Sequence, residues 1–113
     1  MLNVRSQMQR FGGEIDDHPV IHAKVIVESY DAVAGAPTFD VSQCNEVVQW
    51  AYNSYRQAIG VFSEGTSGLT EHARHYLSGE SSKTQVPFEQ WGMARSKVNE
   101  ALELLHSPIQ ELE

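Results

Sequence analysis

The chain has 113 residues and a formal net charge of −7, with 15 acidic side chains against 8 Lys and Arg. Its length fits one small domain, and a hydrophobic content of 41% is typical of a globular protein. The excess of acid argues against binding of nucleic acid or of an anionic membrane, because both need clustered Lys and Arg. The single cysteine, Cys44, cannot form a disulfide within the chain, which suits a reducing compartment. We therefore expect a cytoplasmic protein with no nucleic-acid or membrane partner.

Gly, Pro and polar stretches divide the chain into three parts. We expect a flexible N-terminal arm over residues 1–18, a helical domain over residues 19–107 and a short C-terminal tail over residues 108–113. In the arm, apolar side chains recur at helical spacing, at Val4, Met8 and Phe11. The arm can therefore become a further short helix when it docks onto another surface.

Residues 19–34 form the first predicted element of the domain. Pro19 suits a first helical position, and the apolar residues after it recur at three-and-four spacing. The β-branched run at residues 25–27 would also suit a strand. Because we find no second convincing strand to pair with it, the sequence favours a helix.

The next predicted helix, over residues 40–63, has the clearest pattern. Asp40 followed by Gln43 resembles a capping box, and Phe39 is placed to pack onto Cys44 as a hydrophobic staple. An apolar series with spacings of three and four residues runs through Val41, Cys44, Val48, Ala51, Tyr55, Ala58 and Phe62. Cys44 belongs to this series, so we expect it to be a small buried hydrophobe and not a nucleophile.

Two further helices are expected after a turn at residues 64–68. A short helix spans residues 67–78, and a second long helix spans residues 87–106, opened by Pro87 and closed before Pro108. The predicted fold class is therefore all-α: a small helical bundle with two long helices, one medium helix and one short helix. A chain of this size has little surplus stability, so we also expect a homodimer.

The sequence contains no motif of an enzyme: no P-loop, no G-x-S-x-G elbow and no G-x-G-x-x-G turn. We expect no catalytic residue and no cofactor. Weak candidates for a metal site are Glu71, His72 and His75, with His18 or His22 in addition, since imidazole and carboxylate both bind zinc. The spacing is not that of an HExxH site, and the wheel turns His75 away from the apolar side. We therefore expect solvated histidines and no bound metal.

The helix over residues 40–63 has more apolar surface than one buried face requires. Its apolar arc covers roughly 200° of the helical wheel, about twice the ~100° typical of a surface helix. We assign the apolar series above to the core of the chain. The partner-binding residues that we predict lie outside that series or in the arm: Val47, Trp50, Val61, Tyr52 and Phe11. The first three of them lie together on one flank of the helix.

Three kinds of contact would cover this extra flank. Other helices of the same chain can pack on it, or a second copy can do so in an isologous homodimer. A different protein can also take it, with Trp50 as the kind of buried aromatic anchor that dominates binding energy at interfaces. The sequence leaves these three possibilities open.

A small, acidic, all-helical chain with surplus apolar helix surface resembles the bacterial antiactivators of quorum sensing. The segments that carry the resemblance are "CNEVVQWAYNSYRQAIGVF" (44–62) and "FEQWGMARSKVNEALELL" (88–105). The resemblance implies a homodimer that binds the ligand-binding domain of a LuxR-type acyl-homoserine-lactone receptor and blocks its dimerisation and DNA binding. Two alternatives are a metal- or ligand-binding helical module that uses His72 and His75, and a secretion-chaperone or phasin-like helical protein.

Overall fold

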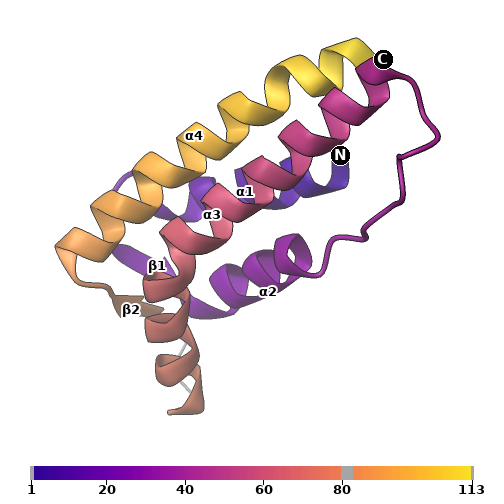
Figure 1. Cartoon of the computed structure of the whole chain (residues 1–113). Coiled ribbons are helices and arrows are strands. Elements are labelled where there is room, and N and C mark those ends of the chain that lie inside the picture. The colour runs from indigo at the N-terminus through magenta and orange to yellow at the C-terminus, as the bar shows by residue number, and fades with distance from the viewer. Residues whose placement is uncertain (1, 80–82, 113) are drawn as a thin grey trace.

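The structure is a computed structural model that describes residues 2–79 and 83–112. Helices account for most of this part of the chain, which confirms the all-α class and the small helical bundle (Figure 1). In chain order the elements are α1 (Leu2–Ile15), β1 (Val20–His22), α2 (Ala23–Ala34), α3 (Glu46–Ser78), β2 (Lys83–Gln85) and α4 (Phe88–Leu112).

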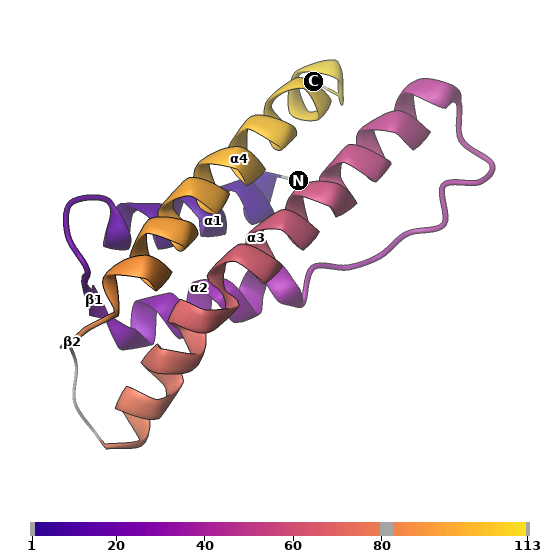
Figure 2. The same ribbon diagram turned by 60° about the vertical axis from the view of Figure 1, so that its left-hand side comes forward.

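The four helices pack around one core in an elongated molecule of 48 × 23 × 20 Å. α3 and α4 run antiparallel and side by side, and they make the most extensive helix–helix contact (Figures 1 and 2). α2 packs against α3, and α1 packs against both α2 and α4. α1 and α2 therefore cover one side of the α3–α4 pair, while no other described element covers its opposite side.

α1 replaces the flexible arm that we expected over residues 1–18, and this expectation is corrected. The apolar residues of the arm are buried on one side of α1, at Val4, Met8, Phe11 and Ile15. Phe11 meets Phe62 of α3 edge to face, with ring centroids 5.1 Å apart. The indole Nε1 of Trp91 donates a hydrogen bond of 2.6 Å to the carbonyl of Ile15. We interpreted the helical spacing of these residues as a capacity to dock onto another surface. In the structure, that surface is the core of the same chain.

The chain contains a two-stranded antiparallel ribbon, although we found no second strand in the sequence: β1 precedes α2 and β2 precedes α4. β1 pairs with β2 in the register Val20↔Gln85 and Ile21↔Thr84. The helix predicted over residues 19–34 is confirmed from Ala23 onward, because the β-branched run at 25–27 lies within α2. Each strand has only three residues, and so short a pairing leaves little periodicity in the sequence.

α3 continues without a break through residues 64–68, where we expected a turn. Hydroxyl groups bond back to the carbonyls of the preceding turn: Thr66 Oγ1 donates to Phe62 O at 2.7 Å, and Thr70 Oγ1 to Thr66 O at 2.9 Å. A Cβ atom on Gly65 would overlap Cβ and Cγ of Lys97 in α4. Gly65 therefore lets two helices approach closely, and the glycine that we read as a turn signal has a packing role.

The start of α3 also differs from our expectation. Asn45 is the N-cap, and its side chain accepts a hydrogen bond of 2.9 Å from Val48 N. Asp40 instead accepts from Ser42 N within the connecting segment 35–45, which carries no helix. Cys44 lies in this segment and is exposed, so its predicted place in the core is wrong. Its chemistry remains that of an exposed thiol with no neighbouring base at hydrogen-bonding distance among the described residues.

α4 passes through Pro108, so the predicted tail over residues 108–113 is helical as far as Leu112. A proline inside a helix removes one backbone hydrogen bond and costs about 3 kcal/mol. Pro108 and the following Ile109 are both buried, and Ile109 belongs to the core cluster. Burying an isoleucine contributes roughly 1.5–3 kcal/mol, which offsets much of the cost.

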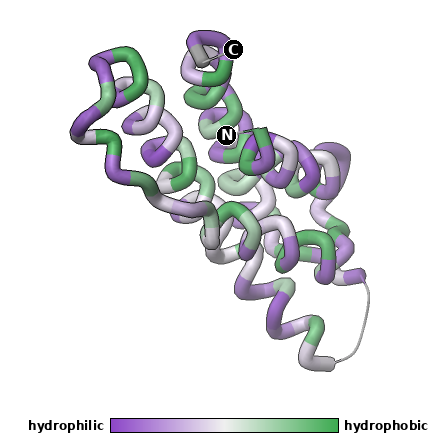
Figure 3. Tube along the Cα trace, turned by 90° about the vertical axis from the view of Figure 1, so that its right-hand side faces the viewer, coloured by the Kyte–Doolittle hydropathy of each residue, from purple (hydrophilic) through white to green (hydrophobic). Residues whose placement is uncertain are grey.

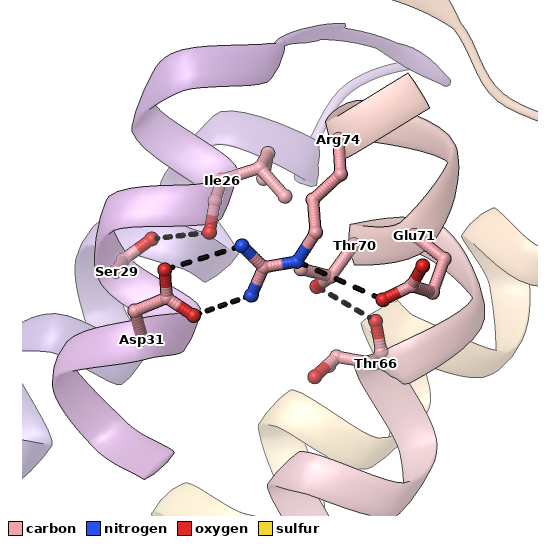
Figure 4. Close-up of polar contacts among 7 residues, drawn as sticks. All are labelled: Ile26, Ser29, Asp31, Thr66, Thr70, Glu71 and Arg74. Atoms are coloured by element: carbon pink, nitrogen blue, oxygen red, sulfur yellow. Dashed lines mark hydrogen bonds and ion pairs between the residues drawn. The ribbon is translucent and has the colours of Figure 1, made fainter. Parts of the chain in front are cut away.

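Polar contacts tie α2 to the second half of α3 (Figure 4). The guanidinium of Arg74 lies between the Asp31 carboxylate, which it contacts in a two-pronged ion pair, and Glu71, whose Oε1 is 3.7 Å from Nε. The hydrogen bonds that Arg74 donates to the Asp31 carboxylate raise the pKa of Arg74 above its usual value. Along every helix, hydrophobic and hydrophilic residues alternate at short intervals, as amphipathic helices require (Figure 3).

Candidate interaction surface

The most exposed apolar side chains of α3 lie in its first two turns. Val47 is 48% exposed and Trp50 is 46% exposed, and neither belongs to the core cluster. They line a shallow hollow of about 290 Å³ together with Glu46 and with Glu111 from the end of α4. The antiparallel pairing brings these two helix ends together (Figure 1). A tryptophan at an open surface hollow is well placed to contact another molecule.

Helical geometry explains why these residues are not in the core. At ~100° per residue, Val47, Trp50 and Val61 fall on a side of α3 adjacent to the one that carries Ala51 and Phe62. On the second side, Ala51 and Phe62 are fully buried, and the ring of Phe62 contacts Phe11 of α1 and Tyr30 of α2. Val61 lies nearer the middle of the helix and is half-buried against the core cluster. The predicted flank is therefore exposed at its end, where Val47 and Trp50 lie, and partly covered in its middle, at Val61.

Tyr52 lies on another side of α3 and is used within the chain. Its hydroxyl oxygen accepts a hydrogen bond of 2.9 Å from Phe39 N, and its ring meets the Phe39 ring edge to face at 6.4 Å. Tyr52 thus holds the connecting segment 35–45 against α3. Phe39 makes this contact in place of the predicted staple onto Cys44. A partner contact through Tyr52 stays a prediction, but it would lie on a different surface from Trp50.

Phe11 is the one predicted contact residue that the structure removes from the surface. Its side chain is fully buried between α1 and α3. We expected it to be presented by a flexible arm. The helical spacing correctly predicted that the arm forms a helix. That helix packs against its own chain and not against a partner.

A second hollow lies further along the same pair of helices, and the sequence analysis missed it. Its volume is about 260 Å³, and its lining residues are Glu64, Gly65, Ser67, Gly68, Leu69, Gln90 and Met93. Met93 is 54% exposed, and the neighbouring Phe88 is 71% exposed. Gly68 lies on the same side of α3 as Trp50 by helical angle. We call the two hollows and the helix surface between them the α3–α4 groove.

The charge of the α3–α4 groove is negative. Glu46 and Glu111 line the first hollow and Glu64 lines the second, whereas no Lys, Arg or His is among the described residues that line either one. The side chain of Lys97 of α4 lies against Gly65, which lines the second hollow, and its Nζ is paired with Glu100 Oε2 at 2.9 Å. The groove therefore combines exposed apolar side chains with uncompensated carboxylates. Position in the sequence gave no hint of this, because Glu46, Glu64 and Glu111 lie far apart in the chain.

The predicted metal candidates do not come together. His72 Nε2 lies 3.1 Å from Thr84 Oγ1 of β2, so this histidine links α3 to the ribbon. Glu71 contacts Arg74, and His75 is exposed. His18 Nδ1 accepts a hydrogen bond of 3.3 Å from Val20 N. Across residues 2–79 and 83–112, no group of three or more His, Cys, Asp or Glu side chains is arranged to hold a metal ion.

Among the helices of the described ranges, none combines the length and the apolar character needed to cross a lipid bilayer. Comparison of the chain with protein-family models, with curated proteins and with solved structures gave no match. The candidate surface therefore has to be interpreted from its own geometry and chemistry.

Proposed function

We propose that this protein is a non-enzymatic interaction protein that binds a transcription regulator and holds it in an inactive form. The observation that carries the proposal is the exposure of Val47 and Trp50, which lie outside the core cluster beside the end of α4. Exposed tryptophans of this kind act as anchors when a partner surrounds them and excludes water. The acidic character of the chain supports a protein partner over nucleic acid.

The regulator that we propose is a LuxR-type quorum-sensing receptor, on the basis of the resemblance to the antiactivators. Such an activator needs two DNA-reading units at a fixed spacing, so its affinity for a palindromic site depends on its own dimerisation. An apolar helical surface that covers the dimerisation surface of the receptor would therefore remove most of its DNA binding. An inhibitor with a net charge of −7 would not itself compete for the DNA.

The homodimer expected from the sequence belongs to the same proposal. We place its contact outside the first hollow of the α3–α4 groove. In an isologous contact through that hollow, Glu46 and Glu111 of one copy would meet the same carboxylates of the other. Light scattering coupled to size-exclusion chromatography tests the dimer, and a Trp50→Lys variant that keeps the dimer would support this placement.

The direct test measures binding of the protein to the acyl-homoserine-lactone-loaded ligand-binding domain of a LuxR-type receptor. We expect a stable complex and, by light scattering, loss of the receptor dimer. Trp50→Ala should weaken the complex by at least about thirtyfold, the effect of a hot-spot residue. Phe39→Ala is the matched control, since Phe39 is an exposed aromatic residue away from the groove. Absence of a complex with the wild-type chain would refute the receptor as partner.

The two alternative functions have no specific observation in their favour. A metal- or ligand-binding module through His72 and His75 would need these side chains to converge, and His72 is engaged with Thr84. A secretion-chaperone or phasin-like role would use the same exposed apolar surface for an unfolded segment or a granule. Both differ from our proposal in the partner, so the receptor-binding experiment separates them from it.

A further inference from the structure

We infer that the α3–α4 groove receives an amphipathic helix of the partner whose apolar ridge is flanked by lysine or arginine side chains. This inference deepens the proposed function, because it specifies the chemistry of the surface that the groove would bind. It rests on the shape of the groove and on its charge. Both are properties of the chain itself, whichever protein carries the helix.

The shape of the groove suits a helix. From Val47 to Gly68, α3 runs for about 30 Å at 1.5 Å per residue, which matches a partner helix of roughly 20 residues. Large apolar side chains stand at the two ends, Trp50 in one hollow and Met93 in the other. Between them Val61 is half-buried, the side chain of Lys97 lies against Gly65, and that of Gln90 lies beside Gly68. The groove therefore offers two apolar contact points about one helix length apart, which suits helix-in-groove recognition.

The negative charge of the groove favours basic residues on either side of the apolar ridge of that helix. Glu46, Glu64 and Glu111 are exposed, and in the described part of the chain no cation lines the same hollows. Glu111 lies in the last turn of α4, where the helix dipole adds to its negative potential. A lysine or arginine beside the apolar ridge of the partner would meet these carboxylates. The net charge of −7 would also speed the encounter with such a partner.

The same charge argues against the other occupants of an apolar groove. A second copy of this acidic chain would bring further carboxylates to the groove. An anionic lipid surface would be repelled for the same reason. An apolar helix with acidic flanks would place like charges together at Glu46 and Glu111, which weakens binding. A basic amphipathic helix is the occupant that fits both the apolar ends and the acidic rim.

Two synthetic peptides of 20 residues test the inference without a receptor. Both carry Leu at helical spacing; one has Lys on either side of the Leu ridge and the other has Glu at the same positions. We expect the Lys peptide to bind, to change the tryptophan fluorescence of the protein, and to shift backbone amide signals of Val47, Val61, Gly68 and Met93. We expect the Glu peptide to give no saturable change. Higher salt should weaken binding of the Lys peptide.

Charge-reversal variants show whether the acidic rim is responsible. Glu46→Lys/Glu111→Lys should raise the Kd of the Lys peptide by at least about tenfold, that is by about 1.4 kcal/mol. Asp17→Lys/Glu103→Lys is the matched control, because these acidic residues are exposed and line neither hollow. The control should change the Kd less than twofold. An equal effect of both pairs would attribute binding to net charge alone and would overturn the inference.

The outcomes for the groove and for the receptor are distinguishable. Binding of neither peptide, equal binding of both, or shifts confined to other surfaces would overturn the inference, even if the receptor complex forms. If the Lys peptide binds in the groove but no LuxR-type domain does, the proposed receptor is wrong and the inference stands. If the receptor complex forms and Glu46→Lys/Glu111→Lys leaves its affinity unchanged, the receptor uses another surface and the inference fails.

Discussion

Two aromatic residues on the same helix, Phe62 and Trp50, have opposite environments. Phe62 is fully buried, and its ring contacts Phe11 of α1 at 5.1 Å and Tyr30 of α2 at 6.2 Å. Trp50 lies three turns earlier, is 46% exposed, and borders a hollow to which α4 contributes Glu111. The two rings differ little in apolar character. The comparison teaches that the position of a residue around and along α3, and not its hydrophobicity, separates the core from the candidate interaction surface.

The largest effect that we expect is on the buried side of α3. Phe62→Ala should lower the free energy of unfolding by about 3–5 kcal/mol, because it leaves a cavity between α1, α2 and α3. Urea unfolding followed by circular dichroism measures this change. If the variant is too unstable to purify, Phe62→Leu should show a smaller loss in the same direction. A loss below about 1 kcal/mol for Phe62→Ala would contradict the core that we describe.

The contact between α3 and α4 gives the next largest effect. Gly65→Ala should destabilise the protein by about 1–3 kcal/mol, since the added Cβ would overlap the side chain of Lys97 and force the helices apart. Gly60→Ala is a matched control on the same helix, because a Cβ at Gly60 meets nothing within 4 Å. The control should be neutral or stabilising by about 0.5–1 kcal/mol. If residues 64–68 formed the turn that the sequence suggested, Gly65 would tolerate alanine as well as Gly60 does.

Trp50→Ala should have a much smaller effect on folding than Phe62→Ala. We expect the free energy of unfolding to fall by less than about 1 kcal/mol, since the side chain is half exposed and does not belong to the core cluster. The thermal midpoint of the isolated protein measures this, and the receptor-binding assay measures the accompanying loss of affinity. A collapse of the thermal midpoint would show that Trp50 supports the fold, and the interaction surface would then be wrong.

A still smaller effect is expected at Tyr52. Tyr52→Phe removes the hydroxyl acceptor of Phe39 N and should cost about 0.5–1 kcal/mol, at the lower end for an exposed hydrogen bond. Amide hydrogen exchange should increase in the segment 35–45, which Tyr52 holds against α3. Binding in the α3–α4 groove should be unchanged. A loss of partner binding as large as that of Trp50→Ala would move the interface to the Tyr52 side of the helix.

The smallest effect is expected at His75. His75→Ala should change neither stability nor metal content, because the side chain is exposed and has no metal-binding neighbours in the described part of the chain. Elemental analysis of protein purified without a tag should give less than about 0.1 metal ion per wild-type chain. A near-stoichiometric metal that is lost in His75→Ala would restore the metal-binding alternative.

Much of the fold was predictable because helical periodicity is a local property. The spacing at residues 23–34 and through Ala51, Tyr55 and Phe62 gave the helices and their buried sides, as the structure confirms. The same wheel placed Val47 and Trp50 outside the core, where the structure has them. It failed for Cys44, because the helix begins only after it, at the Asn45 cap. Asp and Asn both favour the N-cap position, and the sequence pattern led us to Asp40 where the structure has Asn45.

The helical class, the acidic charge and the two apolar sides of α3 follow from composition and local spacing alone. The tertiary structure decided where long-range contacts override local signals. Gly65 reads as a turn residue until Lys97 of α4 is seen against it, and Pro108 reads as a helix end until Ile109 beyond it is found in the core. Phe11 and Trp50 look alike as surplus aromatic residues. The packing of α1 against Phe62 buries the first, and the antiparallel pairing of α3 and α4 places Glu111 beside the second.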